Sequence, residues 1–181
     1  MPQHLTARLL PEVEVSLHAN TPHLTKNHMN PTLSVSTTQS AEILLPLVEK
    51  YHLFEGVEMT TEMRSRVIQP LLGESSYGRI WLVSYQAHFI GYIAVCFCYS
   101  IEFCGRDAFI DEFYLEESYR GKGIGTEVLK LTLEEVKKLS VKALHLEVAR
   151  SNSKAIGLYR RIGFLPRDKY DLYTFELMAD A

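Results

Sequence analysis

The chain has 181 residues, of which 46% are apolar and 23% charged, a composition typical of one soluble domain long enough to bury a core. Its formal net charge of −3 argues against a general nucleic-acid binder, since affinity for phosphate backbones needs a basic surface. No run approaches the roughly 18 apolar residues of a membrane span, and the first thirty residues lack the apolar core of a secretory signal, so a cytoplasmic location is expected.

The early part of the chain predicts an extension followed by short alternating elements. Residues 1–31 show no sustained hydrophobic period and are interrupted by prolines, so we expect a mostly mobile N-terminal extension ahead of one domain over residues 32–181. A short strand at Val13–Leu17 is compatible with that extension. The domain then predicts a strand at Leu33–Ser36, a helix from Thr37 or Thr38 to about Tyr51, a helix from Thr60 or Thr61 to near Gly73, and strands at Arg79–Tyr85 and Phe89–Tyr99 around a turn at Gln86–His88.

The later part of the chain continues the mixture of strands and helices. It predicts a strand over 108–115, a helix from about Gly121 to Leu139, a strand at Ala143–Val148, a helix at Asn152–Ile162 that Gly163 stops, and strands at Phe164–Pro166 and Tyr173–Met178. Elements in this order predict an α/β (α+β) domain in which helices cover both faces of a central sheet.

The cysteines and histidines do not predict a metal site. Three cysteines, an odd number, indicate reduced thiols rather than a disulfide framework. Cys96 and Cys98 lie two apart in a strand-like run and are expected to be small residues on one face of the sheet. The early histidines have no regular ligand spacing; they are His4, His18, His23 and His28. No metal is expected.

A glycine-rich segment, Tyr119–Thr126, separates an apolar strand from an amphipathic helix. Glycines at every second position let the chain turn tightly and let a ligand approach the backbone. The helix that follows presents unpaired amides and the positive end of its dipole, so the turn is suited to a phosphate or pyrophosphate. Arg120 and Lys122 add positive charge. The spacing fits neither a P-loop nor a dinucleotide fingerprint, and a turn that merely caps the helix is the alternative.

The pattern Arg120-x-x-Gly123-x-Gly125 resembles the acetyl-CoA loop of the GNAT superfamily of N-acetyltransferases. Two further blocks, in the right order, resemble the same superfamily. One is the strand Phe109–Leu115 with its acidic residues, and the other runs from Asn152-x-x-Ala through Leu-Tyr159 to Gly-Phe164. The resemblance covers about residues 33 to 178, and its signature blocks are most similar to the diamine (spermidine/spermine) acetyltransferases.

The resemblance implies a fold and a cofactor site. The fold is a mixed, largely antiparallel sheet of about six to seven strands with about four helices on both faces, splayed open beside the strand before the loop, where the pantetheine arm enters. The co-substrate is acetyl-CoA. The residues that the resemblance implies for it are Phe113, Tyr114, Leu115, Arg120, Gly121, Lys122, Gly123, Ile124, Gly125, Thr126 and Asn152.

Tyr159 is the candidate general acid. It occupies the Leu-Tyr position of the superfamily, where a phenol protonates the leaving CoA thiolate, and a pKa of roughly 10 suits that task at neutral pH. A buried core aromatic is the alternative for a tyrosine on such a helix. Asn152 is a candidate pantetheine partner that would also serve as a helix N-cap.

Asp111 and Glu112 are the candidate bases. Adjacent residues of a strand face opposite sides unless a bulge intervenes, so only one is expected to point at the substrate. Alignment to the diamine enzymes puts the base on Asp111, whereas Glu112 fits other members of the superfamily. We favour Glu112, because the longer side chain reaches a water chain more easily.

The acceptor is less defined by the sequence. Tyr51, His52, Phe54 and Glu55 would flank it in this fold, or are ordinary surface residues. An acidic cluster would favour a cationic amine if it lines the cleft, with solvated carboxylates as the alternative. Its members are Glu102, Asp107, Asp111, Glu112, Glu116 and Glu117.

The sequence therefore predicts an acetyl-CoA-dependent N-acetyltransferase that passes the acetyl group directly to a primary amine of a small molecule or a protein. Two alternatives stay open. A non-catalytic acyl-CoA sensor is disfavoured by Tyr159, and an enzyme that acetylates aminoacyl-tRNA is disfavoured by the acidic net charge. Neither a nucleic-acid nor a membrane partner is expected, and homodimers are common in the superfamily.

Overall fold

The computed structural model describes residues 30–177. The predicted extension therefore lies outside the described residues apart from Asn30 and Pro31, as do the strand expected at Val13–Leu17, the four early histidines and Met178. Within the described range the elements are β1 (Thr32–Val35), α1 (Ala41–Glu55), α2 (Thr61–Ile68), β2 (Gly78–Tyr85), β3 (His88–Ser100), β4 (Gly105–Leu115), α3 (Ile124–Lys138), β5 (Leu144–Leu146) and α4 (Ser153–Ile162).

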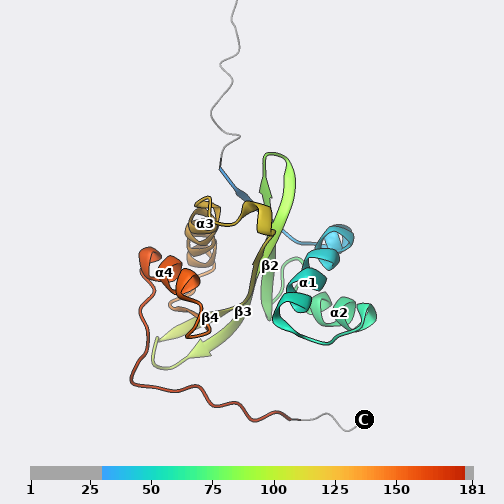
Figure 1. The fold of residues 1–181 in the computed structure, drawn as a ribbon. Helices are drawn as coiled ribbons and strands as arrows, with labels where there is room; N and C mark the ends of the chain where they lie inside the picture. Colours follow the sequence, from blue (N-terminus) through green and yellow to red (C-terminus); the bar gives the residue numbers. More distant parts are fainter. Residues whose placement is uncertain (1–29, 178–181) are drawn as a thin grey trace, which may run out of the picture.

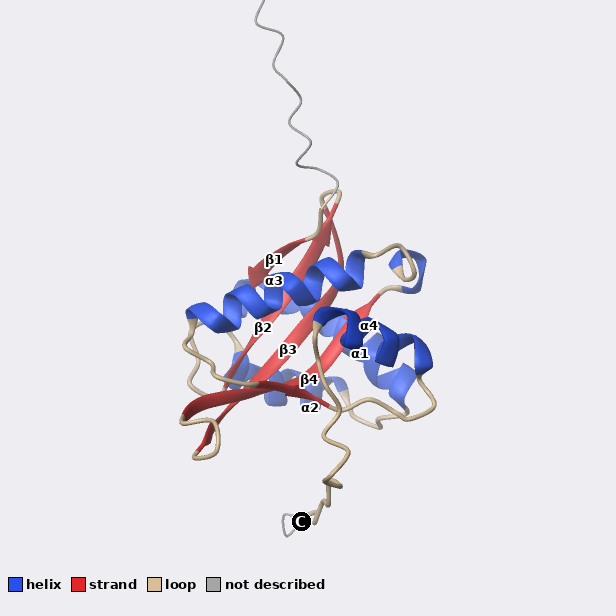
Figure 2. Cartoon of the chain, turned by 90° about the vertical axis from the view of Figure 1, so that its left-hand side faces the viewer, coloured by secondary structure: helices blue, strands red, loops and turns tan. Residues whose placement is uncertain are grey.

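The strands form one mixed sheet in the order β1-β2-β3-β4-β5. The pairs from β1 to β4 are antiparallel, and β4 pairs with β5 in parallel. Helices α1 and α2 lie on one face of this sheet, and α3 and α4 lie on the other (Figures 1 and 2). The α/β class, the mixed pairing and the four helices were predicted correctly.

The central strands are buried on both faces, so successive side chains point alternately towards the α1–α2 pair and towards the α3–α4 pair. On the α1 face, Leu82 and Tyr92 pack with Leu44 and Val48 of α1. On the α3 face, Trp81 and Ile93 pack with a cluster that includes Leu129. This two-sided burial explains why β2 and β3 are continuous apolar runs rather than alternating ones.

The predicted helix ends differ from the observed ones where glycine or proline intervenes. The second helix ends at Ile68 rather than near Gly73, and Pro70 lies in the short 3-10 turn that follows. The third helix begins at Ile124 rather than Gly121, because Gly121 and Gly123 have φ of +72° and +82°. Those angles belong to the left-handed region, so the glycines form the turn before the helix.

The number of strands was predicted wrongly: residues 30–177 contain five strands, not six or seven. The segments Phe164–Pro166 and 173–177 make no ladder, although Tyr173, Phe175 and Leu177 alternate as in a strand. Those three side chains are at least 86% exposed. A period of two gives a strand only when the backbone finds a partner.

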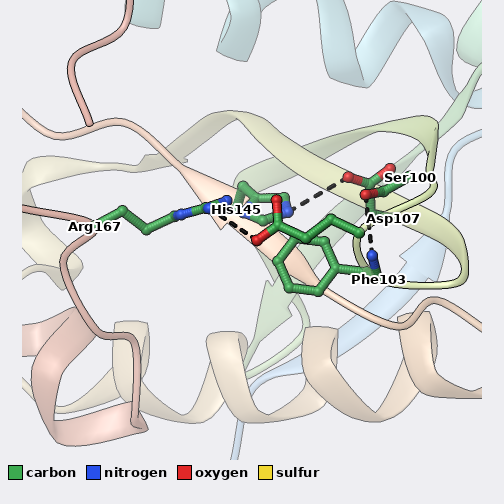
Figure 3. Close-up of polar contacts among 6 residues, drawn as sticks. Ser100, Phe103, Asp107, His145 and Arg167 are labelled. Atoms are coloured by element: carbon green, nitrogen blue, oxygen red, sulfur yellow. Dashed lines mark hydrogen bonds and ion pairs between the residues drawn. The ribbon is translucent and has the colours of Figure 1, made fainter. Parts of the chain in front are cut away.

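The course of the last segment accounts for this difference. Arg167 forms an ion pair with Glu102 at 3.0 Å, and its guanidinium stacks over Phe103, so the chain leaves α4 along the β3–β4 hairpin (Figure 3). It does not run beside β5, which is itself only three residues long rather than the six expected at Ala143–Val148. Within residues 30–177, no helix is both long and apolar enough to cross a membrane.

Candidate active site

A bulge in β4 determines where the two candidate bases point. Val95 pairs with Ile110 and Ala94 pairs with Glu112, which leaves Asp111 without a partner in the ladder. Ile110 packs into the α3 face, whereas Glu112 contacts side chains on the α1 face. Two residues that are two apart would share a face in a regular strand, so the extra residue reverses the alternation.

Glu112 is held by two side chains from other elements. His52 Nε2, on α1, lies 2.8 Å from Oε1, and the Tyr92 hydroxyl, on β3, donates to Oε2 at 2.6 Å. The side chain of Glu112 keeps 21% of its surface exposed, while that of His52 keeps 5%. The carboxylate is therefore fixed by the protein on one side and open to solvent on the other.

Asp111 is exposed, and its charge acts on the same surroundings. Burial first, and then charges that include Glu55, Glu112 and Asp111, raise the pKa of Tyr51 to about 12. Burial and then the charge of Asp111 raise the pKa of Cys96 to about 11. Asp111 thus lies close enough to Cys96 and Tyr51 for its charge to act on both, and it stands at the bulge directly before Glu112.

Tyr92 belongs to the same set of neutral groups. Burial raises the pKa of its phenol, and the neighbouring Glu112 carboxylate raises it further. The phenol therefore stays a hydrogen-bond donor to Glu112 at neutral pH. Tyr51 packs edge-on against the Tyr92 ring, with 6.3 Å between ring centroids.

The sheet opens beside these carboxylates. Ladder pairs between β4 and β5 end at Ile110 and Leu146, but β4 continues to Leu115. The edge of β4 that follows Ile110 therefore has no strand beside it on the β5 side. Phe113, Tyr114 and Leu115, the predicted acetyl-CoA strand, form the end of this open edge.

The glycine loop follows directly and leaves room above its backbone. A Cβ added at Gly121 or Gly123 would meet no atom within 4 Å. Helix α3 begins at Ile124, and the Thr126 amide already donates to the Gly123 carbonyl at 3.0 Å, so the amides of Ile124 and Gly125 are the ones left at the loop. Unpaired amides at the positive end of a helix dipole, with open space before them, can bind a phosphate group.

The Arg120 side chain packs against the protein and does not extend freely into the space above the glycine loop. Its Nε donates to the Leu115 carbonyl at 2.7 Å, and its guanidinium lies over the rings of Phe54 and Tyr114, at 5.1 and 5.4 Å from their centroids. Arg120 thus braces the loop against β4 and α1 while keeping its charge there. Lys122 lies over the ring of Tyr119, within the loop segment, at 5.8 Å.

Tyr159 and Asn152 come from α4. Tyr159 is partly buried beside Phe164, and burial raises the pKa of its phenol. Tyr159 packs against the cluster on the α3 face that contains Ile110, as does Phe113 of the open edge. Asn152 Oδ1 accepts from the Ala155 amide at 3.1 Å, as expected of an N-cap; its contact with pantetheine stays a prediction.

Part of the predicted acidic cluster lies elsewhere. Glu102 pairs with Arg167, and Asp107 lies 3.5 Å from His145 (Figure 3). Glu116 pairs with Lys50, and both line a pocket beside Tyr114. These three carboxylates are therefore partnered. The remaining ones near the opening are Asp111, Glu112 and Glu117. No group of three histidine, cysteine or acidic side chains in residues 30–177 is placed to hold a metal ion.

One pocket lies next to the opening. It has a volume of about 540 Å³, and its lining includes Lys50, Tyr114 and Glu117. Tyr114 follows Glu112 by two residues after the bulge and packs on the same face. The pocket therefore lies on the α1 side, at the end of β4 where the chain enters the glycine loop.

Sequence reasoning missed the role of Tyr92 and did not predict the contact of His52. Tyr92 lies in an apolar run and looks like any core residue. Only the pairing of β3 with β4, and the packing of α1 across both, brings these side chains to Glu112. A contact between residues 60 positions apart has no local sequence signal.

Comparison with known proteins places the fold and the signature blocks in one family. The model described as "Acetyltransferase (GNAT) family" matches residues 46–164. A spermine/spermidine N(1)-acetyltransferase of Bacillus subtilis (strain 168) is 37% identical over 71 residues, which cover 39% of this chain and 47% of that protein. A thialysine N-epsilon-acetyltransferase of Mus musculus is 34% identical over 74 residues, which cover 41% and 43%. The matches thus span less than half of these relatives.

Solved structures are similar over more of the chain. An integron cassette protein from the mobile metagenome of Cole Harbour Salt Marsh is 26% identical with a TM-score of 0.70, over 82% of this chain and 91% of that one. A predicted acetyltransferase from Clostridium acetobutylicum, solved with acetyl-CoA, is 18% identical with a TM-score of 0.64, over 80% and 96%. At that identity the second likeness shows the fold alone.

Proposed function

Because the chain belongs to the acetyltransferase (GNAT) family, we propose that it transfers the acetyl group of acetyl-CoA directly to a primary amine. The observation that carries this proposal is the open edge of β4. It lies between the glycine loop at one end and the Asp111–Glu112 bulge at the other, and Tyr159 packs against the cluster that contains Ile110. In this order, the nucleotide part of acetyl-CoA would lie at the glycine loop, its thioester along the open edge, and the amine beside the carboxylates.

The residues present fit acetyl-CoA in three respects. The space above Gly121 and Gly123 accepts a pyrophosphate on the first amides of α3. The open edge at Phe113–Leu115 offers backbone groups to a pantetheine arm in the manner of an added strand. Tyr159, with its raised pKa, holds a proton at neutral pH.

Bound acetyl-CoA supplies the activated acyl group, and the protein supplies position and proton transfer. Backbone amides of Phe113–Leu115 hold and polarise the thioester carbonyl. Glu112, directly or through one water, takes the proton that the amine nitrogen loses as the new N–C bond forms. Tyr159 gives its proton to the sulfur as the C–S bond breaks. Glu112 gains one proton and Tyr159 loses one, and exchange with solvent restores both for the next turnover. The amine attacks the thioester directly, so no covalent enzyme intermediate forms.

We further propose that the acceptor is a small molecule with a second cationic group. In this proposal Asp111 and Glu112 both face the α1 side. Neither forms an ion pair with a lysine or arginine of residues 30–177, and the phenols of Tyr51 and Tyr92 are uncharged, so the two carboxylates can attract a cation. The matched relatives act, by their names, on spermine or spermidine and on thialysine, all of which carry several charged groups. The exposed Asp111 is suited to contact the cation that does not react.

Replacing Tyr159 by phenylalanine tests the enzymatic proposal against the sensor alternative. The change removes only the hydroxyl, so we expect kcat to fall about 10²–10⁴-fold, as for loss of a general acid, with acetyl-CoA affinity nearly intact. The measurements are initial rates of CoA release and calorimetric binding of acetyl-CoA to both proteins. Equal turnover would reject the acid role.

A further inference from the structure

His52 is an unusual residue for the interior of an α-helix packed on a sheet. It is 4% exposed, and its Nε2 contacts Glu112 Oε1 at 2.8 Å. Its Nδ1 is buried and has no hydrogen-bond partner among the described residues. A buried polar side chain that uses only one of its two nitrogens costs stability, because the other nitrogen has lost its water. The contact with Glu112 is therefore the polar side-chain interaction of His52 that offsets this cost.

The groups around His52 leave Glu112 without a permanent cation. Tyr51 on α1, Tyr92 on β3, and Asp111 and Tyr114 on β4 surround this region, and the ring centroids of Tyr51 and His52 are 6.1 Å apart. Neither a lysine nor an arginine of residues 30–177 pairs with Glu112. Among residues 30–177, Glu112 is thus held by two donors, the His52 ring nitrogen on one oxygen and the Tyr92 hydroxyl on the other.

This arrangement suits a carboxylate that must receive a proton. A carboxylate has about four acceptor sites, so two donors orient it and still leave lone pairs for the incoming proton. A lysine or arginine in the same place would oppose protonation by stabilising the charged form. His52 and Tyr92 come from two different elements, so the pair also fixes the rotation of a long side chain that would otherwise be free.

We propose that His52 is a positioning residue for acetyl transfer, acting through Glu112. Its Nε2–H holds Oε1 while the Tyr92 hydroxyl holds Oε2, and the amine proton is received on a remaining lone pair of Glu112. His52 keeps its own proton throughout. This inference rests on the proposed function and adds to it a residue that never touches either substrate.

The experiment compares two replacements of His52, alone and combined with Glu112→Gln. In His52→Gln the side-chain amide nitrogen lies near the place of Nε2 and can donate to Glu112; in His52→Leu no donor remains. We expect His52→Leu to lower kcat about 10–100-fold, the usual range for loss of a second-layer partner, with the Kd for acetyl-CoA unchanged. His52→Gln should restore most of that loss.

The combined variants separate positioning from folding. If His52 acts through Glu112, His52→Leu should cause no further loss of kcat once Glu112→Gln is present. Val48→Ala is the matched control, because Val48 is fully buried one turn earlier on α1 and has no polar side-chain atom to offer Glu112. It should lower the melting temperature and leave kcat within about twofold, since only core packing is changed.

If His52→Leu does not fold, Tyr92→Phe provides an equivalent test. It removes the second donor with the ring in place, so kcat should again fall in the wild-type background and not in the Glu112→Gln background. Equal fractional losses of kcat in the two backgrounds would overturn the positioning role while leaving the acetyltransferase proposal intact. Absence of acetyl transfer by the wild-type protein would instead reject the proposed function itself.

Discussion

At the residue scale, burial is the largest influence on the protonation of the side chains around the opening. It is the first cause of the raised pKa values of Tyr51, Tyr92 and Tyr159, and the neighbouring carboxylates add to it for the first two. All three phenols are therefore protonated at neutral pH. For Tyr159 this means that the proton needed by the leaving thiolate stays available well into the alkaline range, where amine substrates become nucleophilic.

The thiol of Cys96 gives a prediction at the same scale. A pKa of about 11 leaves roughly a hundredth of the thiolate that an ordinary cysteine has at pH 8, and only the thiolate reacts. Cys98 and Cys104 are exposed. We therefore expect a maleimide to label Cys98 and Cys104 first and Cys96 at least tenfold more slowly, measured by peptide mass spectrometry.

Asp111→Asn serves as the control for this labelling. The charge of Asp111 raises the pKa of Cys96, so its removal should lower that pKa and speed the labelling of Cys96 with little change at Cys104. An unchanged rate at Cys96 would mean that Asp111 does not face the α1 side, and the two-carboxylate arrangement would be wrong.

At the element scale, the site depends on how closely β3 and β4 pair. Gly91 lies opposite Leu115, at the end of β4 that leads into the glycine loop. A Cβ at Gly91 would overlap the Tyr114 carbonyl and approach the Leu115 Cα to 3.0 Å. Since both neighbours are backbone atoms of a paired strand, they cannot move without opening the ladder.

Gly91→Ala should therefore destabilise the protein by about 1–3 kcal/mol, the usual cost of an overpacked interior position. Gly157→Ala is the matched comparison, because Gly157 lies inside α4 and its nearest neighbour would be the flexible Arg161 side chain at 3.6 Å. There, alanine should stabilise the helix by roughly 0.5–1 kcal/mol. Urea unfolding followed by circular dichroism measures both; equal effects would contradict the close approach of β3 and β4.

Local patterns predicted the order of the helices, several of their caps and the loop, but not every helix end, the number of strands or the bulge. Helix caps are predicted within a few residues by Thr60, Asn152 and Gly163. The structure confirms that the side chains of Thr60 and Asn152 accept hydrogen bonds from backbone amides of the first helical turn. The bulge at Asp111 is a property of the register between two strands and has no signature in either one. The alternation around Phe175 was correct as a pattern, but no partner strand accompanies it.

At the scale of the whole molecule, the sheet separates the helix that follows the glycine loop from the helix that contacts Glu112. The glycine loop leads into α3, which lies on the opposite face of the sheet from α1 (Figure 2). Glu112 contacts His52 on the α1 face. The opening between β4 and β5 connects the two faces of the sheet. We infer that the acyl donor and the amine reach this opening from different sides, so each can be selected independently.

The proposed attraction of a cation by Asp111 and Glu112 predicts a dependence on salt. For an acceptor with a second cationic group, KM should rise several-fold between about 50 and 500 mM salt, because screening weakens attraction beyond roughly 10 Å at 0.1 M. kcat should change little. A monoamine without the second cation is the control, and its KM should be nearly constant. A salt-independent KM for both would exclude electrostatic selection of the acceptor.

The most direct measurement is the transfer itself: the wild-type protein with acetyl-CoA and, in turn, polyamines, aminoglycosides, amino acids and N-terminal peptides. Free CoA is followed by a thiol assay and the acetylated amine by mass spectrometry. We expect one amine class, with polyamine-like cations first, to yield CoA and acetylated amine in equal amounts. Acetyl-CoA binding without transfer to any amine would contradict the enzymatic assignment and favour an acyl-CoA sensor.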